Sequence, residues 1–185
     1  MTQDDLLQRA RRLDEEALAV IFDTFYEPLY RYIYHRTGHV STAEDLAADV
    51  FTRLLEQFKR GRGPDRNLKA WLYRVARNLV VDEARRSSHR THAQLDADPW
   101  DEEQNVEREA QRSILSTYAR EALEKLTPNQ RDVVILKYLE GLDNAEVSQT
   151  LGMSVGAVKA LQHRGLAALR RHLVRSGALP KETTA

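Results

Sequence analysis

The segment from residue 143 to residue 171 constrains the fold of this chain more than any other part of the sequence. Asp143 and Glu146 have the spacing of a capping box, which predicts that a helix begins here. Gly152 is placed to end that helix, because glycine readily takes the left-handed conformation of a helix C-terminus. Ser154 is placed to cap a second helix at once. The pattern therefore predicts two helices joined by a tight turn.

The second of these helices carries a basic outer face. Its apolar residues at helical spacing are expected to face inward: Val158, Leu161 and Leu169. The outer face is polar and mostly basic: Lys159, His163, Arg164, Arg170 and Arg171. In a helix-turn-helix, a cationic second helix can enter the major groove of DNA. The alternative for this segment alone is a plain helical hairpin with a solvated basic face.

The rest of the chain is also helical in pattern. No stretch alternates like a strand, and apolar residues recur every three or four positions. In the N-terminal half, helices are expected over residues 14–37, 42–58 and 68–86. Phe22 is expected on the buried side of the first helix, and Ser41 with Glu44 is expected to form a capping box for the second. Further helices are expected over residues 106–126 and 128–141, the latter capped by Thr127.

The net charge of zero is a cancellation between blocks. Residues 61–90 carry eight basic and three acidic side chains, and residues 143–185 carry six and three. Between them, residues 91–112 carry two basic and seven acidic side chains. The acidic block can screen the two basic ones in the free protein. Residues 89–105 show no helical periodicity, so we expect an extended, flexible acidic linker there.

Several classes of protein are excluded by what the sequence lacks. Without cysteine, the chain has no disulfide or cysteine-ligated zinc site. The charged first twelve residues do not resemble a signal peptide, and the apolar run at residues 17–22 is too short to span a bilayer. We therefore expect a cytoplasmic protein without membrane insertion. No catalytic or phosphate-binding motif occurs, and two histidine pairs (35 and 39, 89 and 92) lack carboxylates in register. Hence no enzyme activity, small-molecule substrate, cofactor or metal is expected.

The expected helix over residues 68–86 carries a second basic surface. At about 100° per residue, one stripe of this helix is polar: Arg74, Arg77, Asn78 and Arg85. Arg86 extends the charge, and Tyr73 is the nearest candidate for an exposed aromatic ring. Such a surface suits single-stranded nucleic acid, whose backbone needs cations and whose unstacked bases need a flat partner. The alternative is a solvated surface beside ordinary core aromatics.

Two sets of residues resemble conserved regions of bacterial sigma factors. Region 2 is resembled by residues 43–51 (AEDLAADVF), 70–78 (AWLYRVARN) and 82–86 (DEARR). Region 4 is resembled by residues 122–131 (ALEKLTPNQR) together with the helix-turn-helix. The two regions occur in this order without an intervening region 3 domain, as in the extracytoplasmic-function group of the sigma-70 family. The resemblance covers about residues 14–174.

The resemblance implies an all-α protein of two small helical domains joined by the acidic flexible linker. The region 2 bundle is expected at residues 14–88, the linker at 89–105, the region 4 helix-turn-helix bundle at 106–176 and a tail at 177–185. Such a protein binds core RNA polymerase and directs promoter-specific transcription initiation without being an enzyme itself. An anti-sigma factor is a further implied partner.

The resemblance also implies roles for named side chains. On region 2, the surface that docks on the β′ clamp of polymerase is expected to include Glu44, Asp45, Asp49 and Arg53. The surface that opens the -10 element and holds an extruded base is expected to include Arg60, Arg62, Tyr73, Arg74, Arg77, Asn78, Arg85 and Arg86. Region 4 is expected to contact the β flap and to read the -35 element through Ser154, Lys159, Gln162, His163 and Arg164.

Two places depart from the family pattern. The loop before Trp71 often holds an aromatic or a Phe-Arg-Gly-like run, whereas here residues 60–64 read Arg-Gly-Arg-Gly-Pro. In the recognition helix many members have Lys-Ser-Arg-Leu, whereas residues 159–162 read Lys-Ala-Leu-Gln. Base readout must then depend more on Lys159, Gln162, His163 or Arg164.

Two other classes of protein fit parts of this pattern. One is a stand-alone helix-turn-helix regulator, which binds duplex DNA, usually as a dimer over a palindrome. The other is a helical adaptor that binds only protein. The basic stripe on the helix over residues 68–86 favours the sigma factor, because a simple repressor needs no strand-separating domain.

Overall fold

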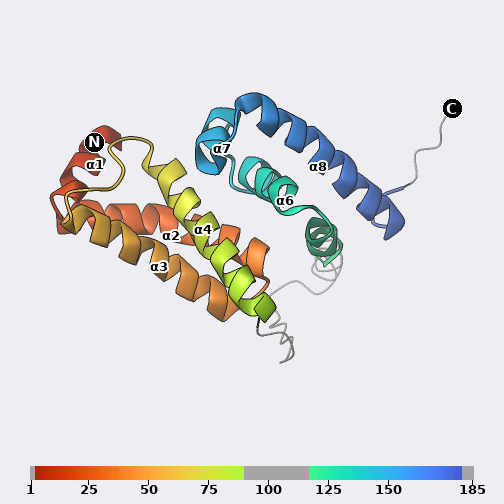
Figure 1. Ribbon diagram of the computed structural model, residues 1–185, viewed down its shortest axis with the longest axis horizontal. Helices are drawn as coiled ribbons and strands as arrows, with labels where there is room; N and C mark the ends of the chain where they lie inside the picture. Colours follow the sequence, from red (N-terminus) through yellow and green to blue (C-terminus); the bar gives the residue numbers. More distant parts are fainter. Residues whose placement is uncertain (1–2, 90–116, 181–185) are drawn as a thin grey trace, which may run out of the picture. The chain divides into compact units, whose positions relative to one another are not determined.

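The computed structural model describes residues 3–89 and 117–180 of the 185-residue chain (Figure 1). All regular structure in these two ranges is helical, as predicted. The chain divides into two compact units. The first contains α1 (Gln3–Arg11), α2 (Glu15–Thr37), α3 (Val40–Lys59) and α4 (Leu68–His89). The second contains helical residues 117–124, α6 (Pro128–Val134), the π-helical turn η1 (Ile135–Leu139), most of α7 (Asn144–Leu151), and α8 (Val155–Arg175).

Two of the predictions lie largely outside the described residues. These are the acidic linker over 89–105 and the first half of the helix over 106–126. Within the described ranges, no helix is both long and apolar enough to cross a bilayer.

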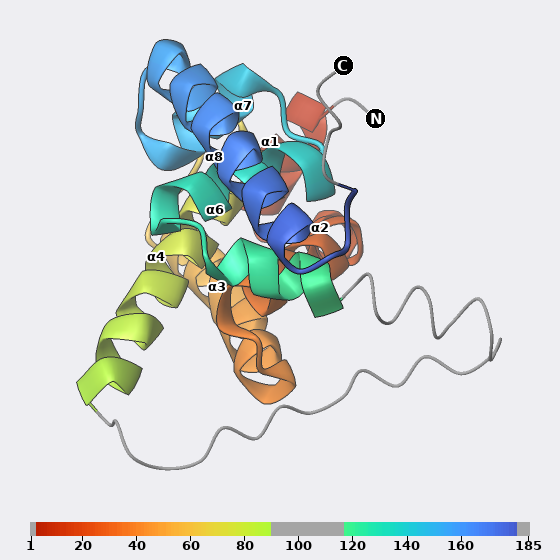
Figure 2. The ribbon, with the colours of Figure 1, turned by 90° about the vertical axis from the view of Figure 1, so that its right-hand side faces the viewer.

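In the first unit α2 and α3 pack against each other, and α4 packs against both (Figures 1 and 2). α2 begins where predicted, because the Asp14 side chain accepts a hydrogen bond from the Ala17 backbone N–H at 2.9 Å. It ends at Gly38, whose φ of +75° is left-handed. The core between the three helices is built from fully buried aliphatic and aromatic side chains: Ile21, Leu29, Tyr32, Ile33, Val50, Leu54, Leu72, Tyr73 and Leu79.

Two predictions for α2 and α3 were wrong. Phe22 is 44% exposed, because the buried stripe of α2 runs through Ala17 and Ile21 instead. The capping box of Ser41 and Glu44 does not form, because α3 begins at Val40 after an extended His39 (φ −124°, ψ 125°). Ser41 therefore lies inside the first turn, and the helix has no side-chain cap.

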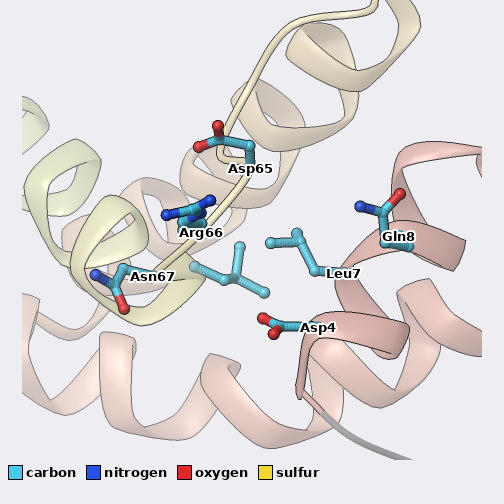
Figure 3. Close-up of a pocket in the computed structure, with 7 residues that line it drawn as sticks. Asp4, Leu7, Gln8, Asp65, Arg66 and Asn67 are labelled. Atoms are coloured by element: carbon cyan, nitrogen blue, oxygen red, sulfur yellow. The ribbon is translucent and has the colours of Figure 1, made fainter.

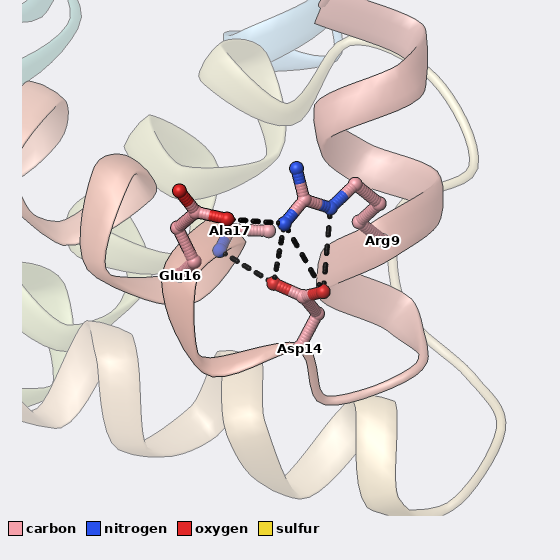
Figure 4. A network of polar contacts seen from close by, with 4 residues as sticks. All are labelled: Arg9, Asp14, Glu16 and Ala17. Carbon is pink, nitrogen blue, oxygen red and sulfur yellow. Dashed lines mark hydrogen bonds and ion pairs between the residues drawn. The ribbon is translucent and has the colours of Figure 1, made fainter.

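The short helix α1 lies before the predicted domain boundary at residue 14 and was not foreseen. It belongs to the first unit, because Leu7 and Ala10 are buried there. The Arg9 guanidinium binds Asp14 Oδ1 at 3.0 Å and Glu16 Oε2 at 2.6 Å, which joins α1 to the start of α2 (Figure 4). The hydrogen bond from Ala17, and then that from Arg9, lower the pKa of Asp14. The Asp14 carboxylate thus both caps α2 and holds α1.

The second unit contains the predicted helix-turn-helix. Asp143 and Glu146 form both bonds of the capping box, each at 2.8 Å. Gly152 ends α7 with a φ of +65°, and the Ser154 hydroxyl accepts a hydrogen bond from the Ala157 N–H at 3.2 Å at the start of α8. These three predictions are confirmed, since each depends on residues close in sequence.

The helix before this motif differs from the prediction at its end. It starts as expected, with Pro128 in its first turn and the Gln130 side chain accepting a hydrogen bond from the Thr127 N–H at 3.2 Å. The α-helix then stops at Val134, and residues 135–139 form a π-helical turn in place of an α-helix that reaches Gly141. This turn carries Tyr138 outward, where 48% of the residue is exposed.

Candidate nucleic-acid interface

The predicted basic stripe lies on the surface of α4. Arg74, Asn78, Arg85 and Arg86 are exposed and Arg77 is half-buried. Arg85 Nη1 lies 3.8 Å from Asp82 Oδ1, and Arg86 Nε lies 3.7 Å from Glu83 Oε2. Ion pairs at such exposed positions are weak and easily exchanged. The guanidinium groups can therefore turn to the phosphates of a nucleic acid.

Tyr73 does not belong to this surface. It is 1% exposed, and its ring meets the ring of Tyr32 edge-on, with centroids 5.5 Å apart and an interplanar angle of 82°. A ring enclosed in the core has no free face on which a base can stack. The expectation of an exposed Tyr73 was wrong because the residue lies on the side of α4 that faces α2, one position before the exposed Arg74.

The loop between α3 and α4, residues 60–67, is shaped by its backbone. Gly63 has a φ of +102°, and a Cβ at this position would lie 3.1 Å from the Phe58 ring. Pro64 is buried, and its carbonyl oxygen accepts a hydrogen bond from Arg11 Nη1 on α1 at 3.4 Å. The predicted DNA contacts Arg60 and Arg62 are exposed on this loop. Arg60 and Arg62 therefore place two positive charges on the loop just before the first residue of α4.

A pocket of about 520 Å³ lies between α1 and this loop (Figure 3). Its lining combines two leucines with acidic, amide and basic side chains: Asp4, Leu7, Gln8, Asp65, Arg66, Asn67 and Leu68. The sequence reasoning did not foresee this pocket, because α1 was outside the predicted domain. Among the described residues, no cluster of three or more His, Cys, Asp or Glu side chains is placed to bind a metal ion.

The four residues predicted to bind polymerase share the surface of α3. Glu44, Asp45, Asp49 and Arg53 are all exposed.

The aromatic residues at the contact between α2 and α3 were missed as a surface feature, since Phe22 was assigned to the core. Phe22 lies 4.9 Å from Tyr26 and 4.8 Å from Phe51, measured between ring centroids.

The residues predicted to read duplex DNA divide between two sides of α8. Lys159, His163 and Arg164 are exposed, and Ser154 is exposed while serving as the cap. Gln162 differs, because it lies only about 40° around the helix from the buried Val158. Its amide donates a hydrogen bond of 2.6 Å to the hydroxyl oxygen of Tyr138. The structure thus joins Gln162 to η1, while Gln162 remains only about 60° around α8 from Lys159.

Comparisons with known proteins agree with this arrangement. Residues 21–90 match the family described as sigma-70 region 2, and residues 116–169 match the family described as sigma-70, region 4. The chain is 36% identical over 177 residues to the ECF RNA polymerase sigma factor BldN of Streptomyces coelicolor, covering 91% of this chain and 65% of that protein. It is 31% identical over 170 residues to the ECF RNA polymerase sigma factor SigX of Bacillus subtilis, covering 86% of this chain and 84% of that protein.

The fold is similar to that of two solved structures. CnrH, solved in complex with the cytosolic domain of CnrY, has a TM-score of 0.70 at 22% identity, covering 92% of this chain and 96% of CnrH. RpoE of Bartonella quintana, a sigma factor solved with the anti-sigma factor NepR, has a TM-score of 0.64 at 18% identity, covering 84% of this chain and 95% of RpoE. At these identities the likeness concerns the fold.

Proposed function

Because this chain belongs to the extracytoplasmic-function sigma factors of the sigma-70 family, which direct promoter-specific transcription initiation by RNA polymerase, we propose that its two units divide the recognition of one promoter. The first unit opens the -10 element and holds an unpaired base. The second reads the -35 element as duplex. The polymerase supplies the chemistry of RNA synthesis, and the chain acts as its specificity subunit. Its place of action is the cytoplasm, where the polymerase works.

The exposed stripe on α4 is the observation that carries this proposal. Arg74 and Asn78 are exposed and Arg77 is half-buried on α4, and Arg60 and Arg62 are exposed on the loop before this helix. Unpairing and extruding a base costs a few kcal/mol, which contacts to the base and its phosphates must offset. Arg85 and Arg86 extend the surface for a further length of single strand. Duplex-binding repressors need no such surface, which argues against the regulator reading.

On the second unit, α8 is the recognition helix. Lys159, His163 and Arg164 project from its exposed side and contact bases and phosphates of the -35 element. Ser154 caps the helix by accepting a hydrogen bond from the Ala157 N–H. The other backbone N–H groups of the first turn point toward a phosphate. Because Gln162 is bonded to Tyr138, it supports the helix and does not read bases.

Core polymerase binds both units in this proposal. The exposed Glu44, Asp45, Asp49 and Arg53 on α3 dock on the β′ clamp, and the second unit docks on the β flap. An anti-sigma factor is the proposed regulatory partner, by likeness to the RpoE complex. Purification from the native host under non-inducing conditions should then recover a second protein besides polymerase.

Run-off transcription tests the proposal most directly. The full chain added to core polymerase should produce a discrete transcript from a cognate promoter, and core polymerase alone should not. Without polymerase the chain should bind the same duplex weakly, because its net charge is zero. Tight specific binding of duplex by the chain alone, together with no transcription, would favour a stand-alone regulator.

A further inference from the structure

We propose that α1 forms one wall of the pocket that receives the extruded base, and that Asp4 and Gln8 on this helix help to select that base. The inference rests on the proposed role of the loop at residues 60–67 in the first unit. α1 lies before residues 21–90, which match sigma-70 region 2. The wall is therefore contributed by a segment outside the matched region.

Three kinds of contact hold α1 in place beside the loop. Leu7 and Ala10 are buried, so one face of the helix belongs to the core of the first unit. Arg9 binds the carboxylates of Asp14 and Glu16 at the start of α2 (Figure 4). Arg11 donates a hydrogen bond to the carbonyl oxygen of Pro64 within the loop itself. Because α1 is bonded both to the start of α2 and to the loop, the side chains of α1 that face the loop have a defined position relative to it.

The lining of the pocket suits a flat ring with a polar edge. Leu7 from α1 provides one apolar part (Figure 3). Leu68 from the start of α4 provides the other. Asp4 and Gln8 approach from α1, while the polar side chains on the other side come from the loop: Asp65, Arg66 and Asn67. A nucleobase has two apolar faces and an edge of donors and acceptors, so it matches this mixture. A volume of about 520 Å³ is within the usual range for small-molecule pockets.

The polar groups indicate which bases fit. Asp4 and Asp65 are acceptors when ionised, and Gln8 offers both a donor and an acceptor. Carboxylates accept hydrogen bonds from exocyclic amino groups, as aspartate does from the amino group of cytosine. Thymine has no amino group, and its single N3–H donor lies between two carbonyl oxygens that a carboxylate repels. Arg66 supplies a cation for a neighbouring phosphate. The pocket should therefore prefer a base that carries an amino group over thymine.

The experiment uses holoenzyme assembled from core polymerase and the full chain, with a promoter library randomised across the -10 element. With the unmodified chain, one position should prefer amino-bearing bases over thymine. Asp4→Asn and Gln8→Ala should each reduce this preference about tenfold at that position alone, the size expected for one good base contact. Preferences elsewhere, including the -35 element, should not change. Asp5→Asn is the matched control, since Asp5 lies on the same helix but does not line the pocket.

The outcomes separate this inference from the proposed function. An unchanged preference in Asp4→Asn and Gln8→Ala, or a loss of transcription that is equal for all bases, would overturn the role of α1. The function of the first unit is tested independently by Asn78→Ala on α4. If that change impairs promoter opening while the α1 variants keep the original preference, the proposed function stands and the inference fails. If neither affects the -10 element, both fail.

Discussion

The side-chain amide of Gln162 on α8 donates a hydrogen bond of 2.6 Å to the hydroxyl oxygen of Tyr138 on the π-helical turn η1. Many family members have leucine where this chain has Gln162. Here Gln162 instead forms a polar pair with Tyr138, which is 48% exposed. Because a hydrogen bond is directional, the pair restricts how α8 lies against η1. π-helical turns often occur at functional sites, and this one joins Tyr138 to α8, the helix proposed to read DNA.

Removing the Tyr138 hydroxyl should cost stability only while Gln162 is present. Tyr138→Phe keeps the ring and should lower the free energy of unfolding by about 1 kcal/mol, the usual net value of one hydrogen bond. In a Gln162→Leu background the same change should have little effect, because leucine has no donor to satisfy. Denaturant unfolding of the four chains measures the coupling. Equal effects of Tyr138→Phe in the two backgrounds would show that the bond contributes nothing.

The stripe on α4 should matter more for promoter opening than for promoter binding. Asn78→Ala and Arg77→Ala remove groups that are proposed to contact the unpaired strand, so closed complexes should form while opening is impaired. Permanganate reactivity of unpaired thymines near the start site reports opening. Lys69→Ala is a control for lost charge, since Lys69 lies about 180° around α4 from Asn78 at about 100° per residue. If the stripe variants open promoters normally but fail to bind polymerase, the stripe is a protein interface.

The exposed side of α8 should separate base contacts from phosphate contacts. Lys159→Ala should cost about 1–3 kcal/mol at a single base pair of the -35 element. If Arg164 contacts phosphate, Arg164→Ala should weaken all sequences alike and reduce the salt dependence. Transcription from a library randomised across the element measures both. Arg175→Ala is the control, about 24 Å further along the helix from Lys159. A Lys159→Ala variant with unchanged strength and preference would remove this residue from the readout.

The close approach of α6 and α8 depends on Gly165. A Cβ at this position would lie 3.1 Å from Val134 Cγ2 and 3.5 Å from the Gln130 carbonyl oxygen. Gly165→Ala should therefore lose about 1–3 kcal/mol to overpacking against roughly 1 kcal/mol gained in helix propensity, so this variant should be less stable than Gly156→Ala. Gly156→Ala on the same helix meets only the Ser154 hydroxyl at 3.9 Å and should be stabilising by roughly 0.5–1 kcal/mol. Thermal unfolding compares the two, and similar melting temperatures would contradict the steric argument.

Sequence patterns predicted some features of this chain reliably. The capping box of Asp143 and Glu146 formed as expected, and so did the cap at Ser154. Each involves residues three positions apart, so the interaction depends on local geometry alone. The same holds for the basic character of α4 and α8, which follows from composition and helical spacing. Family membership also followed from short motifs in a fixed order.

Other features were decided by contacts between distant residues. Tyr73 was expected at the surface and Phe22 in the core, and the structure reverses both, because the side that a helix buries depends on its neighbours. Gln162 bonds to a residue 24 positions earlier in the sequence, because the π-helical turn η1 brings Tyr138 within hydrogen-bond distance of α8. No local pattern in the sequence predicts this π-helical turn.

The sequence by itself determined the longer helices, the caps at Asp143 and Ser154 and the placement of basic charge, since these depend on residues within one or two helical turns. The tertiary structure alone decided which faces are exposed and that α1 joins the first unit. A nine-residue helix such as α1 is marginal in isolation and is stabilised by burying Leu7 and Ala10 and by the bond from Arg9 to Asp14. The pocket beside the loop exists only because of that docking.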